Sequence, residues 1–295
     1  MKQFHGQHKR RSFFEGWYLK HQNAETTISF IPAFHISSEG EKSLSIQILT
    51  PGCAKNACYG AEQFLVNQDH FSIQVEKNHF SDTGLAVDIT LEDFYVRGRL
   101  TYGPLTPLDT DIMGPFSHIP FLQCNHGVLS MRHQLDGILD INGTSVDFSG
   151  GTGYIEKDWG SSFPQSYLWT QSCFFTPEGL PCSIMLSIAH IPMLGAHFTG
   201  CIAAIWVNGR EYRMATYRRV KILTYTQSEA LIEQGALRLH VRLKEPDARP
   251  LYAPAGGNMT RTIYESPSCS VWYQFSVYGS TQFELTVPDA SFESG

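Results

Sequence analysis

The sequence predicts an all-β protein built from two consecutive lipocalin-like antiparallel β-barrel halves. Apolar and polar residues alternate along much of the 295-residue chain, tight-turn signals recur between the alternating runs, and hardly any stretch has helical periodicity. A barrel hides the edges of an antiparallel sheet and leaves a central cavity for an apolar ligand. We therefore expect barrels rather than open sheets.

The individual elements follow from local patterns. Residues 71–75 and 237–244 alternate strictly between apolar and polar side chains, which is typical of half-buried strands. Asn-Gly pairs at 142–143 and 208–209 stand between strand-like runs and predict two-residue hairpin turns. The segment SEALIEQ at 228–234 is the one helical indication and predicts a turn or two of helix.

The length of the chain suffices for two domains of ordinary size. We expect residues 1–152 to form an N-terminal β-barrel-like domain and residues 153–295 a C-terminal lipocalin-like β-barrel domain. Residues 103–123 contain four prolines and little alternation, so they predict a long ordered loop. This loop is either a lid over a binding site or a strap that caps the end of a barrel.

Composition limits the possible partners. The net charge is -6, and the one basic run, residues 9–11, is too short to hold DNA or an anionic membrane by itself. We expect no nucleic-acid partner. The chain has neither a signal-like apolar run nor about 18 successive apolar residues, which predicts a soluble, cytoplasmic protein.

Metals and cofactors have no recognisable motif. The seven cysteines are scattered and contain no C-x-x-C pair, so neither a disulfide framework nor a thiolate zinc site is expected. Twelve histidines are present, but the spacing of His118, His126 and His133 matches no usual ligand motif. The chain also lacks nucleotide-binding glycine motifs. We expect no metal and no cofactor.

The segment GTGYIEKDWGSSFP at residues 151–164 concentrates charge in a chain with only 17% charged residues. In an extended strand Glu156 and Asp158 lie on one face, and two nearby carboxyl groups push their pKa values apart. Such a pair can divide the roles of acid and base. The alternative is structural, in which the pair accepts backbone N–H groups or binds Lys157 or Arg261 and holds two domains in register.

Three segments resemble the marker segments of the tocopherol cyclase family: FFEGWYLK (13–20), GYIEKDWGSSFPQSYLWTQ (153–171) and RPLYAPAGGNMTRTIYES (249–266). They occur in the family's order and with its spacing. The resemblance implies a two-part β-barrel fold distantly similar to lipocalins, and a cofactor-free closure of a prenylated hydroquinone to a chromanol. The chain lacks a transit peptide and reads EKDWGSS where plant members have a more glycine-rich turn; its histidine content also suggests a bacterial branch.

Closing a chromanol ring needs an acid that protonates an alkene, a wall that tolerates a cation, and a base for the phenol. We expect Asp158 to be the acid, with Glu156 as its partner and Glu15 as a second candidate. Aromatic faces stabilise cations. The expected substrate-binding residues are Trp17, Tyr18, Trp159, Tyr167, Trp169, Arg261 and Glu265. Arg261 and Glu265 are alternatively a buried structural pair, and His35, His190 or His197 could deprotonate the phenol.

Two functions remain open. The first is a cofactor-independent cyclase, or a related isomerase or hydratase, that acts on a prenylated (hydro)quinone or another isoprenoid. The second is a non-catalytic lipocalin-like carrier of a similar apolar ligand. In either case the ligand could be collected by transient contact with a membrane surface. An ionisable carboxyl group that opens onto apolar walls favours the enzyme, whereas one bound fully to backbone or arginine favours the carrier.

Overall fold

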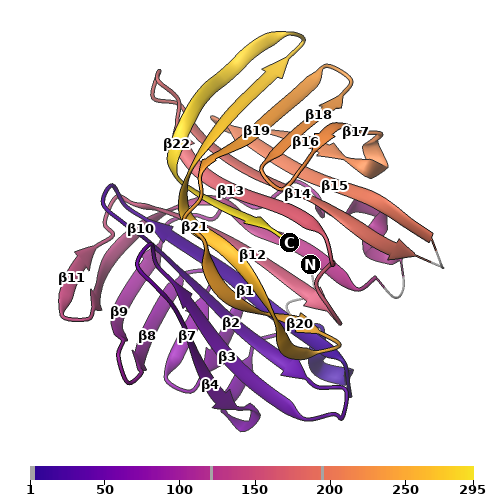
Figure 1. The fold of residues 1–295 in the computed structure, drawn as a ribbon. Helices are drawn as coiled ribbons and strands as arrows, with labels where there is room; N and C mark the ends of the chain where they lie inside the picture. The colour runs from indigo at the N-terminus through magenta and orange to yellow at the C-terminus, as the bar shows by residue number, and fades with distance from the viewer. Residues whose placement is uncertain (1–3, 120–121, 194–195) are drawn as a thin grey trace. The chain divides into compact units, whose positions relative to one another are not determined.

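The computed structural model describes residues 4–119, 122–193 and 196–295. Within these ranges the chain is all-β, with two antiparallel sheets and a few short 3-10 turns, as the alternation predicts. Figure 1 shows the strands of the first sheet in indigo to pink and those of the second in red to yellow. No helix among the described residues is long and apolar enough to cross a membrane.

The first sheet has twelve strands in the order β4-β3-β2-β1-β12-β10-β9-β8-β7-β6-β5, with β11 paired to β10. Their bounds are β1 Phe13–Gln22, β2 Thr27–Ile36, β3 Lys42–Leu49, β4 Ala54–Gly60, β5 Phe64–Val66, β6 Ser72–Val75, β7 Asn78–Ser81, β8 Gly84–Thr90, β9 Tyr95–Tyr102, β10 Cys124–Ile141, β11 Thr144–Asp147 and β12 Thr152–Gly160.

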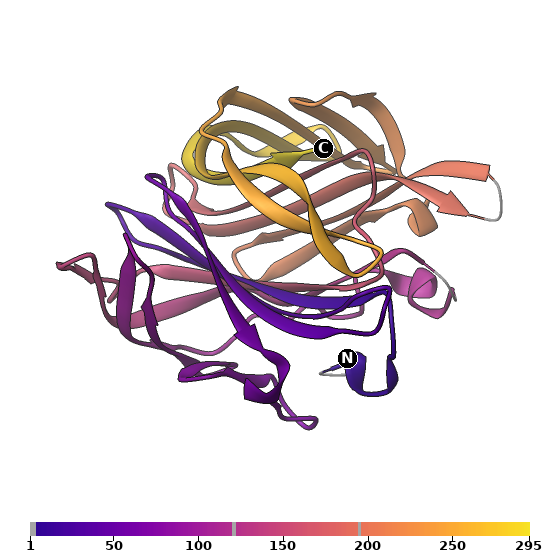
Figure 2. The ribbon, with the colours of Figure 1, turned by 60° about the horizontal axis from the view of Figure 1, so that its bottom comes forward.

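The two edge strands of this sheet follow one another in the chain. β4 ends at Gly60 and β5 begins at Phe64, with only the 3-10 turn η2 (Ala61–Gln63) between them. A link of this length spans at most about 14 Å. The sheet must therefore curl until its edges approach each other, and its curvature is visible in Figure 2. This is the barrel-like arrangement that the sequence predicts.

The second sheet has ten strands in the order β16-β15-β14-β13-β22-β21-β19-β18-β17, with β20 paired to β21. Their bounds are β13 Tyr167–Phe175, β14 Pro181–Met193, β15 Ala196–Val207, β16 Arg210–Ala215, β17 Lys221–Tyr225, β18 Glu229–Gln234, β19 Leu237–Glu245, β20 Arg249–Ala255, β21 Asn258–Val277 and β22 Ser280–Ser294. Its edge strands, β16 and β17, are again consecutive and are joined through η4 (Thr216–Arg218).

The structure confirms the two predicted hairpin turns and contradicts the predicted helix. Asn142-Gly143 and Asn208-Gly209 form the expected hairpin turns, and all four residues have positive φ. The helix expected at 228–234 is wrong, because residues 229–234 form β18, which pairs with β17 and β19. Ala230 and Ile232 are buried on one face of that strand. Burial at a spacing of two residues overrides the helical propensity of the segment.

The chain divides into two compact units. Unit 1 comprises residues 1–107, 126–162 and 252–261, and unit 2 comprises 108–125, 163–251 and 262–295. The loop 103–123 carries η3 (Gly114–His118) and no strand in its described part, which confirms the predicted lack of regular structure. Each unit has its own apolar core. The core of unit 1 contains Trp17, Phe30 and Phe80, and the core of unit 2 contains Tyr273 and Phe275.

A short segment from the C-terminal part of the chain belongs to unit 1. The Gln47 side chain donates to the Tyr252 carbonyl and accepts from its N–H, at 2.9 and 2.7 Å. The N–H groups of Gly256 and Gly257 donate to Ser162 Oγ and to the Ser161 carbonyl, each at 2.8 Å. The segment 252–261 is therefore fixed beside the end of β12.

Candidate active site

Strand β12 carries the charged motif and separates it into two faces. Strand β1 pairs with it so that Tyr18 lies opposite Glu156 and Trp17 lies opposite Lys157. Since side chains alternate along a strand, Glu156 and Asp158 occupy one face, and Lys157 and its odd-numbered neighbours occupy the other.

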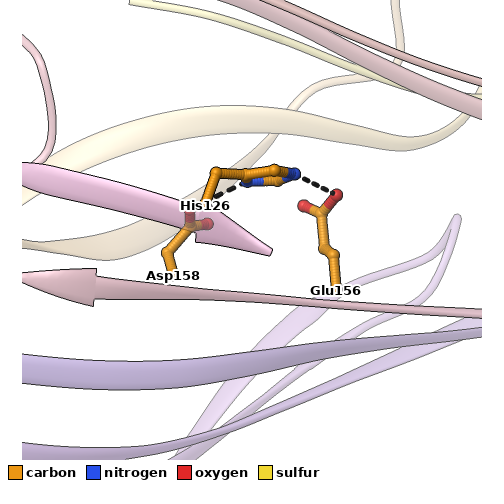
Figure 3. Close-up of side chains that lie close together, drawn as sticks. All are labelled: His126, Glu156 and Asp158. Atoms are coloured by element: carbon orange, nitrogen blue, oxygen red, sulfur yellow. Dashed lines mark hydrogen bonds and ion pairs between the residues drawn. The ribbon is translucent and has the colours of Figure 1, made fainter. Parts of the chain in front are cut away.

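On the first face His126 of β10 joins the two carboxyl groups. Its Nδ1 lies 2.9 Å from Asp158 Oδ1, and its Nε2 lies 3.4 Å from Glu156 Oε2. Figure 3 shows the imidazole ring between the two carboxyl groups. The side chains of His126 and Glu156 are 10% and 5% exposed, whereas that of Asp158 is 25% exposed. Asp158 is thus the most accessible member of this group, which we call the His126 triad.

The triad holds a proton strongly. Burial by itself lowers the pKa of His126, but the neighbouring carboxylates of Glu156 and Asp158 outweigh it and raise that pKa to about 10. His126 is therefore an imidazolium in neutral solution. With both carboxyl groups ionised, the triad contains one transferable proton and carries one net negative charge.

Two tyrosines complete this face. The Tyr154 hydroxyl donates to Glu156 Oε2 at 2.5 Å, and both side chains are buried. Tyr18 lies opposite Glu156, and its hydroxyl oxygen accepts a hydrogen bond from Ser29 Oγ at 3.1 Å. The triad is therefore flanked by aromatic side chains of its own face.

The ligand atoms of the triad lie within 4.8 Å of one another, so the group also has the composition of a metal site. Its geometry argues otherwise. Asp158 faces Nδ1 and Glu156 faces Nε2, so each carboxyl group lies at a different nitrogen of the ring. An ion bound to one nitrogen would contact the carboxylate at that nitrogen and leave the other behind. The arrangement fits a shared proton better than a metal ion.

Comparison with known protein families shows one similarity. The family model described as tocopherol cyclase-like matches residues 82–219. The match covers a little less than half of the 295-residue chain and shows a similarity to this family. The matched region includes all three residues of the His126 triad. No curated protein sequence matches the chain.

Solved structures share the fold of this chain at low sequence identity. A protein from Nitrosomonas europaea, described as a candidate AttH, is 12% identical over 96% of this chain and 92% of its own, with a TM-score of 0.54. Kievitone hydratase from Nectria haematococca is 12% identical, with coverages of 96% and 88% and a TM-score of 0.53. CghA is 9% identical, with the same coverages and a TM-score of 0.58. These similarities show a common fold.

The opposite face of β12 holds a different set of charges. Lys157 Nζ lies 2.9 Å from Glu15 Oε1, and both side chains are almost completely buried. Glu15 also accepts a hydrogen bond from the backbone N–H of His5 at 2.7 Å. Trp159 stacks on the His5 ring, with centroids 4.2 Å apart, and Trp17 is fully buried. Glu15, Trp17 and Trp159 therefore lie on the face away from the triad.

The remaining predicted site residues are divided between the units. Tyr167, Trp169 and Glu265 are buried in unit 2, where the Tyr167 hydroxyl donates to Glu293. Arg261 is the last residue of the segment 252–261, which belongs to unit 1. Of the residues that the sequence singles out as site candidates, Glu156, Asp158 and Tyr18 lie on the triad face of unit 1.

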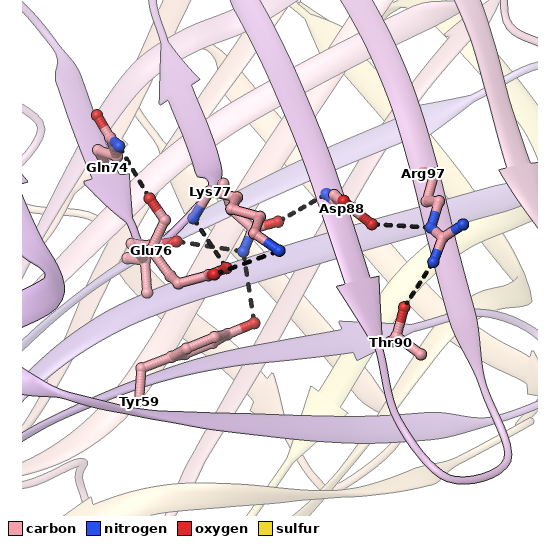
Figure 4. A network of polar contacts seen from close by, with 9 residues as sticks. Tyr59, Gln74, Glu76, Lys77, Asp88, Thr90 and Arg97 are labelled. Atoms are coloured by element: carbon pink, nitrogen blue, oxygen red, sulfur yellow. Dashed lines mark hydrogen bonds and ion pairs between the residues drawn. The ribbon is translucent and has the colours of Figure 1, made fainter.

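A polar cleft of about 380 Å³ opens elsewhere in unit 1 (Figure 4). Its charged side chains are paired, Arg97 with Asp88 at 2.8 Å and Lys77 with Glu76 at 3.6 Å. Both pairs are largely exposed, and such pairs add about 0–1 kcal/mol to stability. This lining does not suit an isoprenoid, so the cleft is a solvated network.

Proposed function

We propose that this chain is a cofactor-independent enzyme that protonates an alkene of an isoprenoid or prenylated aromatic compound and closes a chromanol-type ring. The observation that carries the proposal is the proton held between His126, Asp158 and Glu156, on a face that also bears two tyrosines. The similarity of residues 82–219 to the tocopherol cyclase-like family model supports the same reaction class.

The proton would leave through Asp158. This carboxyl group is the most exposed of the three, and it accepts directly from His126 Nδ1 at 2.9 Å. An apolar substrate that covers Asp158 excludes water and disfavours the charged pair relative to a neutral imidazole and a carboxylic acid. The acid proton then moves to the alkene carbon, while Glu156 keeps the imidazole oriented.

The charge balance suits a carbocation. When the proton leaves, the triad carries two negative charges beside the tertiary cation that forms. The rings of Tyr18 and Tyr154 can add about 0.5–2 kcal/mol for each cation contact. The phenolic oxygen attacks the cation, and its proton returns to the triad. No electrons are gained or lost, so the reaction needs no redox cofactor.

The same triad could serve a hydratase, because protonation of the alkene is the shared first step and water would replace the phenol as nucleophile. Kievitone hydratase has a similar fold, and its name describes the addition of water. Hydration is therefore the second candidate reaction. A carrier would hold the ligand without changing it, and its triad would be structural.

The deciding experiment incubates the full-length protein with a prenylated hydroquinone in deuterated water and analyses the products by mass spectrometry. A cyclase yields an isomer of the substrate with one carbon-bound deuterium, since the new C–H bond comes from the triad. A product heavier by one water identifies a hydratase. Unchanged substrate that co-purifies with the protein identifies a carrier and refutes the proposed catalysis. A panel of isoprenoids of different length and headgroup would define the substrate class.

A further inference from the structure

Unit 1 contains a second polar cluster, formed by His21 of β1, Tyr102 of β9 and His133 of β10. His21 and His133 are both buried, and the Tyr102 ring lies against each imidazole, with centroids 5.6 and 4.5 Å away. His21 lies opposite Gly153 of β12. Residue 153 is an odd-numbered position, so this cluster lies on the face of β12 away from the His126 triad.

The hydrogen bonds of His21 define its tautomer. Its Nδ1 lies 3.3 Å from the Ile28 carbonyl oxygen, which can only accept, so Nδ1 carries the hydrogen. The His21 side chain is completely buried, which disfavours a second ring proton and its positive charge. Nε2 therefore presents a lone pair, and the Tyr102 hydroxyl at 2.6 Å donates to it.

The tautomer of His133 follows from the single proton of Ser130. Ser130 Oγ donates to the Arg132 carbonyl at 3.0 Å and accepts from the Thr106 N–H at 3.1 Å. It must therefore also accept from His133 Nδ1, which lies 3.1 Å away. His133 Nε2 is left with a lone pair, and no residue that the structure describes donates a hydrogen bond to it. An unsatisfied buried polar atom calls for an explanation.

The missing side chain of Gly153 leaves room for the His133 ring beside the cross-strand partner of Gly153, His21. A Cβ atom at residue 153 would lie 2.2 Å from His133 Nε2, so the ring occupies the volume that a side chain would fill. The Cβ atoms of cross-strand partners lie about 4.5–5.5 Å apart. His133 Nε2 is therefore at most about 8 Å from the Cβ of His21, on the same face, with the Tyr102 ring against both imidazoles.

We propose that His21, Tyr102 and His133 bind a divalent transition-metal ion of the zinc and copper type. Both imidazoles offer Nε2 while Nδ1–H is held by a fixed acceptor, which is the usual arrangement of metal-binding histidines. On binding, the Tyr102 O–H bond breaks, its proton leaves to solvent, and the phenolate oxygen and both Nε2 atoms bind the ion. Imidazole nitrogens suit zinc and copper, and three protein ligands leave a fourth position for water, hydroxide or another small anion.

One of the three separations between the proposed ligand atoms is already close to that around a bound ion. Ligand atoms about 2.0–2.1 Å from a tetrahedral ion lie about 3.3 Å apart. The present separation of 2.6 Å between His21 Nε2 and the Tyr102 oxygen must therefore increase by less than about 1 Å. The ion would also bind the lone pair of His133 Nε2, which has no hydrogen-bond donor among the described residues.

The test uses the full-length protein after treatment with a chelator, titrated separately with Zn²⁺ and Cu²⁺. We expect one equivalent of each ion to bind, Zn²⁺ to raise the melting temperature, and Cu²⁺ to produce a visible phenolate-to-copper charge-transfer band. This readout is independent of catalysis. If the folded wild-type protein shows neither a Zn²⁺-dependent melting shift nor the band, the proposal is overturned.

Variants locate the ion. Tyr102→Phe should remove the charge-transfer band, and Ser130→Ala, which removes the acceptor of His133 Nδ1–H, should weaken Zn²⁺ binding about 10–100-fold. His35→Gln is the matched control, because His35 is also buried with an unpartnered ring nitrogen but is hydrogen-bonded to Ser45 elsewhere in unit 1. It should bind normally. Loss of the wild-type signal in His126→Gln alone would assign the ion to the triad and refute the proposed site.

Discussion

His126 Nδ1 lies 2.9 Å from Asp158 Oδ1 across 32 residues of sequence, and this pair connects the charged motif of β12 to a proton source on β10. The relationship predicts that Asp158→Asn removes the group that transfers the proton while it keeps the size of the side chain. Turnover should fall by about 10²-fold or more, the usual scale of general acid catalysis. Ligand affinity, followed by tryptophan fluorescence, should change little.

Two further variants make this prediction specific. Glu156→Gln should reduce turnover less than Asp158→Asn, because Glu156 orients and stabilises His126 rather than delivering the proton. Asp93→Asn changes an exposed carboxylate that pairs with Lys55 and should leave turnover unchanged. Wild-type turnover in Asp158→Asn would mean that the triad is structural.

The raised pKa of His126 predicts a specific dependence of stability on pH. The folded state binds the His126 proton up to about pH 10, whereas an unfolded histidine releases it near 6.5. The stabilisation is therefore complete below about pH 6.5 and is lost as the pH rises toward 10. His126→Gln should flatten this decline by at most about 1.4 kcal/mol per pH unit, the value for one proton. Urea denaturation from pH 6 to 10 measures both slopes, and equal slopes would contradict the assignment.

Alternation along single strands allowed much of the first face of β12 to be predicted. Glu156 and Asp158 are two residues apart in an extended segment, so their common face follows from strand geometry alone. The same rule places Trp159 on the other face, where it stacks on His5. The expectation that Trp159 lies beside the acids relied on adjacency in sequence, which in a strand separates side chains rather than joining them.

His126 had no local signal. It contacts β12 because β10 and β12 are neighbours in the sheet, and such a pairing between distant strands leaves no periodic pattern in the sequence. The spacing of His118, His126 and His133 was considered only for a metal, although His126 and His133 bind different groups. The contact between His126 and the two carboxyl groups becomes apparent only once β10 and β12 are known to be neighbours.

The N-terminal segment of unit 1 should contribute strongly to stability through Phe4. This ring is buried among Trp17, Phe34 and Phe64, with centroids 5.3–6.5 Å away. Phe4→Ala should lower the free energy of unfolding by about 3–5 kcal/mol through lost burial and a cavity. Phe175→Ala is the control, since that side chain is 56% exposed and its loss should cost about 0.5 kcal/mol or less. Similar denaturation curves for Phe4→Ala and wild type would refute the packing role.

Variants of the buried pair of Glu15 and Lys157 test whether Glu15 is a structural carboxylate or the catalytic acid. Lys157 Nζ is 2.9 Å from Glu15 Oε1, and neither side chain is more than 1% exposed. Glu15→Gln leaves the ammonium group without this counter-charge, and breaking a buried ion pair typically costs about 3–5 kcal/mol. Lys157→Met should destabilise the protein similarly, and the double variant Glu15→Gln, Lys157→Met should lose less than the sum of the two.

Lys55→Gln provides the comparison, because it breaks the exposed pair of Lys55 and Asp93 and should cost about 1 kcal/mol or less. Denaturation midpoints and turnover should be measured on the same samples. If Glu15 is structural, Glu15→Gln lowers stability, while the molecules that remain folded turn over substrate at nearly the wild-type rate. If instead Glu15→Gln keeps its stability and loses turnover about 10²-fold, the acid lies at Glu15, and the reaction takes place on the face of β12 away from His126.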